Sequence, residues 1–102
     1  SVKSHTDGQI LYLKDVDKDG EEGTLYLYQN GKSVKLADDA AVHAGKQEMS
    51  YIEAYGFFHG DKVAFLSDYN FNKVRGDLNV YNGKESVQVD TDVAMILLYD
   101  VK

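Results

Sequence analysis

The stretch that decides the fold is G-T-L-Y-L-Y-Q-N-G-K, residues 23–32, because a close copy of it, G-D-L-N-V-Y-N-G-K, stands at residues 76–84. The two copies lie 53 residues apart, so that Tyr28 corresponds to Tyr81. Apolar, aromatic and glycine positions recur together in both copies. An internal repeat of this kind indicates one supersecondary unit built twice.

The correspondence continues on both sides of the quoted stretch. Upstream, I-L-Y-L-K-D-V-D from Ile10 aligns with V-A-F-L-S-D-Y-N from Val63. Downstream, after a one-residue deletion in the second turn, S-V-K-L-A-D-D aligns with S-V-Q-V-D-T-D. The sequence therefore predicts a single domain, residues 1–102, built of two repeats at about 8–45 and 58–102.

Each repeat has the pattern of strands joined by hairpins. Leu25 and Leu27 alternate with tyrosines, and this period of two predicts a strand with its aliphatic side chains on one face. Asn-Gly dipeptides at 30–31 and 82–83 favour tight hairpin turns. The segment 40–48 is expected to be a loop or a short helix. The strands predicted in this way cover residues 10–14, 25–28, 34–37, 49–58, 63–66, 78–81, 87–90 and 94–101.

The fold class expected from these patterns is all-β, with about eight antiparallel strands in two similar units. The order of features in each unit is strand, Asp-rich loop, glycine, Leu/Tyr strand, Asn-Gly-Lys turn, strand and acidic ending. Over residues 8–39 and 61–92 this order resembles the four-stranded blades of bacterial β-propeller-like repeat proteins. The resemblance implies a non-enzymatic, extracytoplasmic or surface-attached protein that serves as a sensor or interaction platform.

The number of units departs from that resemblance, because two units do not close a ring of roughly four to eight blades. The apolar faces of the units then need another cover. Three arrangements are open: the two units pack face to face, sandwich-like or as a partial propeller; the chain associates with copies of itself; or the chain is a fragment of a longer array. Face-to-face packing within the chain is favoured, with self-association through sheet faces or edges as a further expectation.

Composition excludes several classes of partner. The chain has 17 acidic and 11 basic residues, and its formal net charge of −6 repels nucleic acids and anionic lipid surfaces. The longest apolar run, 93–99, is far shorter than the roughly 20 residues that a membrane-spanning helix needs. Cysteine is absent, which excludes disulfides and thiolate chemistry. We therefore expect no nucleic acid partner and no membrane insertion.

The loop D-V-D-K-D-G-E-E-G, residues 15–23, is a candidate metal site. Asp15, Asp17 and Asp19 match the first half of an oxygen-rich calcium loop, and Glu21 is a further possible ligand. The match then fails, because a tyrosine stands where an EF-hand carries its bidentate glutamate. The alternative is a solvated turn whose Asp side chains bond their own backbone, and this interpretation is favoured.

Aromatic residues are the other candidates for ligand contact. Tyr26, Tyr69 and Phe71 are predicted to lie on an outer face or loop, where their rings suit a sugar or a protein partner. Tyr28 and Tyr81 stand at equivalent repeat positions, and we expect them to pack in the core or across strands.

Sequence signals for catalysis are missing. The three histidines are isolated, and neither an H-E-x-x-H metal motif nor a G-x-S-x-G nucleophile motif occurs. We therefore expect a non-catalytic binding or scaffolding module that acts on a protein partner, with calcium as the one cofactor to consider. The alternative is a small-ligand binder that takes calcium in the acidic loop or a glycan on exposed tyrosines.

Overall fold

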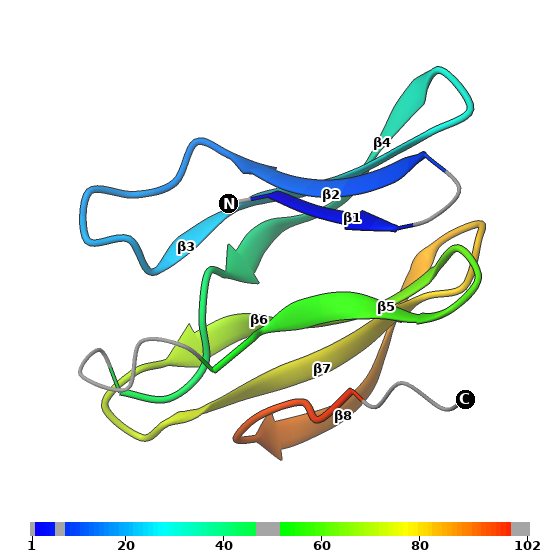
Figure 1. Ribbon diagram of the computed structural model, residues 1–102. Helices are drawn as coiled ribbons and strands as arrows, with labels where there is room; N and C mark the ends of the chain where they lie inside the picture. The colour runs from blue at the N-terminus through cyan, green and yellow to red at the C-terminus, as the bar shows by residue number, and fades with distance from the viewer. Residues whose placement is uncertain (1, 6–7, 47–51, 99–102) are drawn as a thin grey trace.

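The computed structural model describes residues 2–5, 8–46 and 52–98 of the 102-residue chain (Figure 1). Within these ranges the chain forms eight strands and no helix, and every strand pair is antiparallel, which confirms the all-β prediction. The strands are β1 (Val2–His5), β2 (Gln9–Lys14), β3 (Glu22–Gln29), β4 (Lys32–Ala41), β5 (Tyr55–His59), β6 (Lys62–Asn70), β7 (Arg75–Tyr81) and β8 (Ser86–Val93).

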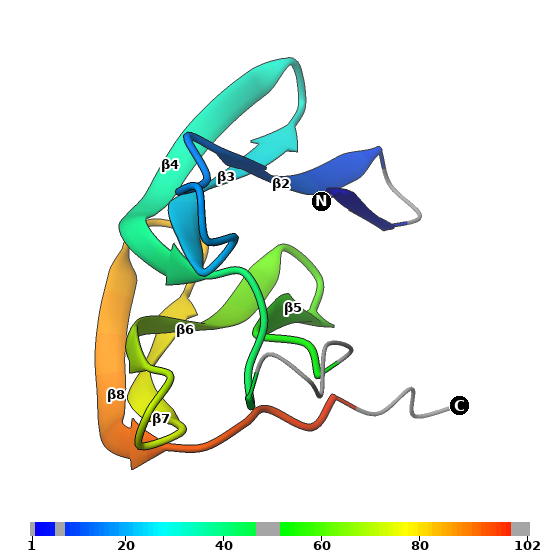
Figure 2. The ribbon, with the colours of Figure 1, turned by 90° about the vertical axis from the view of Figure 1, so that its left-hand side faces the viewer.

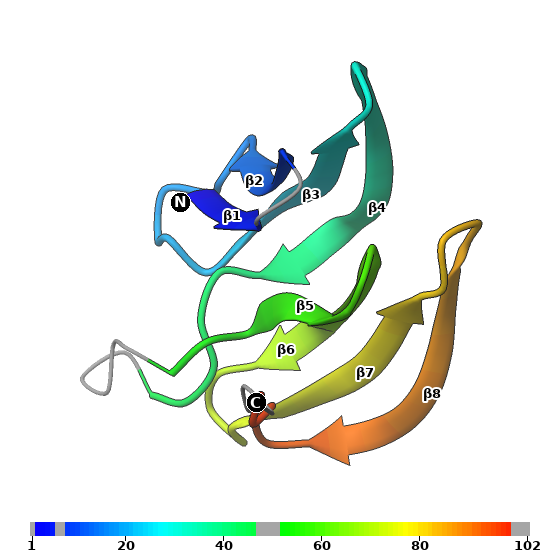
Figure 3. The ribbon, with the colours of Figure 1, turned by 45° about the vertical axis from the view of Figure 1, so that its right-hand side comes forward.

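The strands make one open sheet in the order β1-β2-β3-β4-β6-β7-β8, with β5 paired to β6 outside this path. Strands β1 to β4 form a first meander and strands β5 to β8 a second. The meanders are joined where Ala40 of β4 pairs with Ser67 of β6. Figure 3 shows the two meanders following the same course, β1 to β4 above and β5 to β8 below.

The two meanders pair their strands in the same register at the 53-residue offset. Leu11 pairs with Leu27 in the first meander, and the corresponding Ala64 pairs with Val80 in the second. The same holds between the last two strands of each meander, including the irregularities in the ladder. The first two strands of each meander share the offset as well, since Val2 pairs with Tyr12 and Tyr55 with Phe65. A common offset through three successive strand pairs follows from residue patterns that repeat along the chain.

Glycine recurs where the ladder between the last two strands becomes irregular. A Cβ on Gly76 would lie 2.8 Å from the carbonyl oxygen of Ser67 and 2.9 Å from the Cα of Tyr69. A Cβ on Gly23 would lie 3.0 Å from the carbonyl oxygen of Lys14. At Gly76 the backbone passes too close for a side chain, so the bulge needs glycine there, and at Gly23 a side chain would fit only if its neighbours moved.

Left-handed backbone conformations also recur. Asp15 and Asp68, at equivalent positions, have φ values of 53° and 48°, a region that Asp tolerates better than most residues. The glycines of the two Asn-Gly dipeptides, Gly31 and Gly83, likewise have φ values of 76° and 99°. The first hairpin is the predicted two-residue turn. The second is longer, because the Asn82 side chain accepts hydrogen bonds from the backbone N–H groups of Lys84 and Glu85.

One cluster of buried side chains draws on both meanders. It combines leucines of β2 and β3 with aromatic and aliphatic residues of β5, β6 and β7. Figure 2 shows the first meander above, the second meander in the middle, and the chain that follows β8 passing below the second meander. The cluster members are Leu11, Leu25, Leu27, Leu36, Ala40, Ala41, Ala44, Ala54, Tyr55, Val63, Phe65, Leu66, Tyr69 and Tyr81.

Three predicted segments differ from the structure. No strand forms over 94–98, and residues 99–101 of that predicted strand lie outside the described residues. Residues 42–46 contain no helical turn, while 47–48 are outside the described part. The strand predicted from residue 49 begins only at Tyr55, and its first residues, 49–51, are not described. The strand β1 was not predicted.

Candidate functional site

Each meander has two faces of different composition. In the first meander Leu11 pairs with Leu27 and Leu13 with Leu25, so these four side chains share one face, the first aliphatic face. The opposite side is the first aromatic face. It carries Ile10, Tyr12, Tyr26 and Tyr28, which are likewise cross-strand partners.

The second meander repeats this division. Its second aliphatic face carries Ala64, Leu66, Leu78 and Val80, the counterparts of the first four leucines. Its second aromatic face has counterparts of the other four residues: Val63, Phe65, Asn79 and Tyr81.

The equivalent faces of the two meanders differ in how deeply they are buried. On the first aliphatic face Leu11, Leu25 and Leu27 are fully buried, and on the second aromatic face Val63 and Phe65 are almost completely buried. All five belong to the single core cluster. The first aromatic face is half-buried to exposed throughout, whereas the second aliphatic face is divided: Ala64 and Leu66 are buried, and Leu78 and Val80 are half-buried. The molecule therefore has one largely buried example of each kind of face and one more exposed example, which we call the open face of that kind.

The first aromatic face is built around a stacked pair of rings. Tyr12 and Tyr26 lie 5.3 Å apart with an angle of 11° between their planes, and the Tyr12 hydroxyl donates a hydrogen bond to Ser33 Oγ at 2.8 Å. The ammonium of Lys14 is 5.6 Å from the centre of the Tyr26 ring, within range of a cation–π contact. Tyr28 beside them is 38 % exposed. The face is thus apolar with a polar rim, a composition common in protein contact surfaces.

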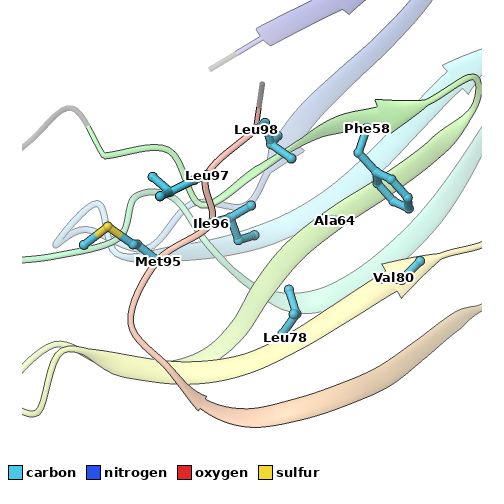
Figure 4. Close-up of a pocket in the computed structure, with 8 residues that line it drawn as sticks. All are labelled: Phe58, Ala64, Leu78, Val80, Met95, Ile96, Leu97 and Leu98. Carbon is cyan, nitrogen blue, oxygen red and sulfur yellow. The ribbon is translucent and has the colours of Figure 1, made fainter. Parts of the chain in front are cut away.

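The second aliphatic face is hollowed by an apolar cavity of about 400 Å³. Figure 4 shows Phe58 of β5 and the β7 side chains Leu78 and Val80 on one wall, with the residues that follow β8 on the other. The eight lining residues carry no charged or polar side chain: Phe58, Ala64, Leu78, Val80, Met95, Ile96, Leu97 and Leu98. Several of them are open to solvent, most of all Leu97 at 66 % and Phe58 at 48 %.

Residues 94–98, here called the 94–98 segment, form the outer wall of this cavity. The Tyr69 hydroxyl donates a hydrogen bond to the carbonyl of Ala94 at 2.8 Å and accepts one from the backbone N–H of Gly45 at 2.9 Å. Ile96 packs against the core, and Leu98 Cδ1 occupies the place where a Cβ on Gly56 would stand. Tyr69 and side-chain packing therefore hold the segment on the second aliphatic face.

Contrary to the prediction from the sequence, Tyr69 does not lie on an outer face or loop. Its side chain is only 5 % exposed, because both its ring and its hydroxyl are used inside the molecule. Phe71 is half-buried and packs edge-on against Tyr69 at 4.8 Å and near the His43 ring at 5.1 Å. Of the three predicted contact residues, Tyr26 is the one that lies on an open face.

The acidic loop is ordered by its own hydrogen bonds. Asp17 Oδ1 accepts a hydrogen bond from the Glu21 N–H at 2.8 Å, and the Asp17 carbonyl accepts one from Gly20 at 3.0 Å. Across the described ranges, no three His, Cys, Asp or Glu side chains are grouped so that they could hold a metal ion. Asp15, Asp17, Asp19 and Glu21 are therefore not arranged as a ligand set here, and calcium binding stays a prediction.

A different group of carboxyls meets where the two meanders join. A side-chain hydrogen bond with Asp39 raises the pKa of Asp68, and partial burial and the Asp39 charge add to that rise. Partial burial also raises the pKa of Glu22, helped by the charges of Asp39 and Asp68. This group was not predicted, since Glu22, Asp39 and Asp68 are brought together only by the pairing of β4 with β6.

Comparison of the chain with protein-family models, with curated proteins and with solved structures found no match. In the part of the chain that the structure describes, no helix is long and apolar enough to cross a bilayer.

Proposed function

We propose that the chain is a non-catalytic binding or scaffolding module made of two blade-like units. In this proposal the first aliphatic face packs on the second aromatic face, as neighbouring blades of a propeller pack. The common register at an offset of 53 residues supports equivalence of the units. The joint burial of Leu27 and Phe65 in one cluster supports their packing.

The binding surface in this proposal is the second aliphatic face. The observation that carries it is the cavity of about 400 Å³ with a wholly apolar lining. Monomeric soluble proteins rarely leave contiguous apolar surface open unless it binds something, and ligand or partner sites are typically concave and mostly apolar. An interaction platform at the bacterial surface, as the blade resemblance implies, accords with a module whose chemistry is limited to contact.

The test is binding of the apolar dye 8-anilinonaphthalene-1-sulfonate to the folded protein. We expect dye fluorescence to rise with the parent chain and to fall severalfold with Phe58→Ser, which removes a cavity wall that is 48 % exposed. Val16→Ser is the matched control, because Val16 is similarly exposed at 42 % but lies in the acidic loop. If dye fluorescence does not rise with the folded parent, or if the dye binds both variants equally, the second aliphatic face is not the binding surface.

The alternative function is small-ligand binding on the first aromatic face. The observation in its favour is the stacked, partly exposed pair Tyr12 and Tyr26 with Lys14 beside it, since such platforms suit sugar rings. Thermal melts with a panel of neutral and acidic oligosaccharides test it. A rise in Tm that Tyr26→Ala abolishes favours this function, and no rise with any sugar counts against it.

A further inference from the structure

We propose that the second aliphatic face is a docking site for a second copy of this chain, which inserts its first aromatic face and displaces the 94–98 segment. The two copies then stack head to tail, and the pair as a whole keeps one open face of each kind. This inference rests on the proposed function, because it requires the second aliphatic face to be a binding surface.

The first argument is that the two open faces are the counterparts of the two buried ones. Leu27 is fully buried, whereas its counterpart Val80 is half-exposed. Leu36 is 6 % exposed in β4, and its counterpart Val89 in β8 is 53 % exposed. The second aliphatic face is therefore less completely covered than its equivalent, although its Leu66 is fully buried. An interface between non-identical faces leaves one of each open and extends by adding copies.

The second argument is continuity of the sheet. The described pairing of β5 with β6 ends at Phe65, and one more backbone hydrogen bond joins Leu66 to Ala54. Ser67 lies beyond both and pairs with Ala40. In the first meander the described pairing of β1 with β2 likewise ends at Tyr12. Lys14, the counterpart of Ser67, lies beyond that pairing. Within the chain Ala40 of the first meander pairs with Ser67 of the second. If a second copy continues the sheet in the same way, Val93 of the first copy, the counterpart of Ala40, pairs with Lys14 of the second copy.

A side-chain hydrogen bond between β8 and β4 would be repeated between two copies in the same way. Ser86 Oγ at the start of β8 donates to the carbonyl of Leu36 in β4 at 2.9 Å. The counterpart of Ser86 is Ser33 in the first meander, and the counterpart of Leu36 is Val89 in the second. Ser33 Oγ accepts the Tyr12 hydroxyl, so its own proton is available to the Val89 carbonyl of the neighbouring copy.

The third argument concerns the 94–98 segment, which covers the site incompletely. It leaves the apolar cavity beneath it and exposes 66 % of Leu97. The equivalent stretch of the first meander, 42–45, does not fold back in this way, because Ala44 pairs with Ile52 on the way to β5. The first aliphatic face is therefore free to be covered by the second meander. The second aliphatic face would be covered in the same way by the first meander of another copy.

Cysteine cross-linking tests the geometry directly, since the natural chain has no cysteine. Full-length Lys14→Cys and Val93→Cys chains are mixed in a glutathione redox buffer at up to about 1 mM protein, where weak association is populated. We expect disulfide-linked dimers in the mixture and far fewer with either chain alone. Lys32→Cys with Val93→Cys is the negative control. The double variant Ala40→Cys/Ser67→Cys, whose positions are partners within the chain, is the positive control.

Release of the segment tests the displacement. Leu98→Ser removes the side chain that rests on Gly56, and we expect the dissociation constant of the dimer to fall about three- to tenfold in sedimentation equilibrium. Val16→Ser should leave it unchanged. An unchanged dissociation constant with Leu98→Ser shows that the segment does not compete and overturns the displacement.

The two proposals fail in different ways. If the cysteine mixture stays monomeric while the positive control closes its disulfide, docking of a second copy is overturned. Dye binding that still depends on Phe58 then leaves the proposed function standing with another partner. If the dye does not bind either, the second aliphatic face is no binding surface, and both proposals fall.

Discussion

Tyr28 and Tyr81 hold the same position in their meanders, paired across the strand with Ile10 and Val63, yet Tyr28 is 38 % exposed and Tyr81 only 4 %. Sequence and local structure are shared, so the difference comes from what lies over each face. The second aromatic face is inside the core and the first is at the surface. This asymmetry is the basis for the docking inference.

The same pair predicts unequal losses of stability. Tyr81→Ala leaves a cavity in the core and should lower the free energy of unfolding by about 3 kcal/mol. Tyr28→Ala should cost less than about 1 kcal/mol, because the ring is already partly solvated. Urea unfolding followed by far-UV circular dichroism measures both. Equal losses would mean that the two aromatic faces are equally covered.

The glycines of the two bulges predict that two alanine variants differ in their loss of stability. Gly76→Ala pushes a methyl group into backbone atoms of Ser67 and Tyr69 and should cost about 1–3 kcal/mol. Gly23→Ala meets Lys14 O and the more yielding Val16 side chain at 3.0 Å, so its cost should be smaller. Thermal melts measure the two losses, and Gly76→Ala should have the lower Tm. A harmless Gly76→Ala would contradict the close backbone approach.

The carboxyls at the junction predict a stability that rises on mild acidification. Glu22 and Asp68 have pKa values raised above their ordinary 4.5 and 3.8, so the folded chain holds more protons than the unfolded chain between the ordinary and the raised values. Stability therefore falls as pH rises through that window and stays reduced at neutral pH. Asp39→Asn removes the main repulsive charge and should raise Tm at pH 7.

The control for that prediction is the pH profile itself. Tm of the parent and of Asp39→Asn should converge as the pH falls through the raised pKa values of Glu22 and Asp68, because these two carboxyls then lose their charge. A constant gap between the two melting curves from pH 7 to pH 4 would assign the effect of the variant to packing. A lower Tm for Asp39→Asn at pH 7 would contradict the raised pKa values.

The acidic loop predicts a structural role for one aspartate. Asp17→Ala loses the hydrogen bond to the Glu21 N–H and should destabilise the chain by about 1 kcal/mol, whereas Asp17→Asn keeps an acceptor oxygen and should cost less. Melts with and without millimolar calcium separate this role from an ion site. A calcium-dependent rise in Tm that both variants abolish would restore the calcium interpretation.

Local patterns in the sequence were sufficient for strands β2 to β4 and β6 to β8. Alternation in Leu25–Tyr28 and apolar runs such as 63–66 identify strands because the pattern is set by the faces of the sheet. The repeat also anticipates the shared register. The apolar run at 94–98 was misread, because a run of this length is equally compatible with packing across a face, which is what Ile96 and Leu98 do.

The candidate site depended on information that no local pattern carries. Tyr69 looks like a loop aromatic, but its burial is decided by Gly45 and Ala94, which are distant in sequence. The carboxyl pair Asp39 and Asp68 likewise arises only where β4 meets β6. Alternation of aliphatic and aromatic residues assigns the two faces of each meander, whereas the exposure of each face depends on which distant residues cover it.

The measurement that tests the account most directly is nuclear Overhauser spectroscopy on chains with labelled leucine methyl groups. If the first aliphatic face packs on the second aromatic face, methyl groups of Leu11, Leu25 and Leu27 show cross-peaks to ring protons of Phe65 and Tyr81. Cross-peaks from those leucines only to residues within the first meander, or to Met95 and Ile96, would contradict this packing and the docking that follows from it.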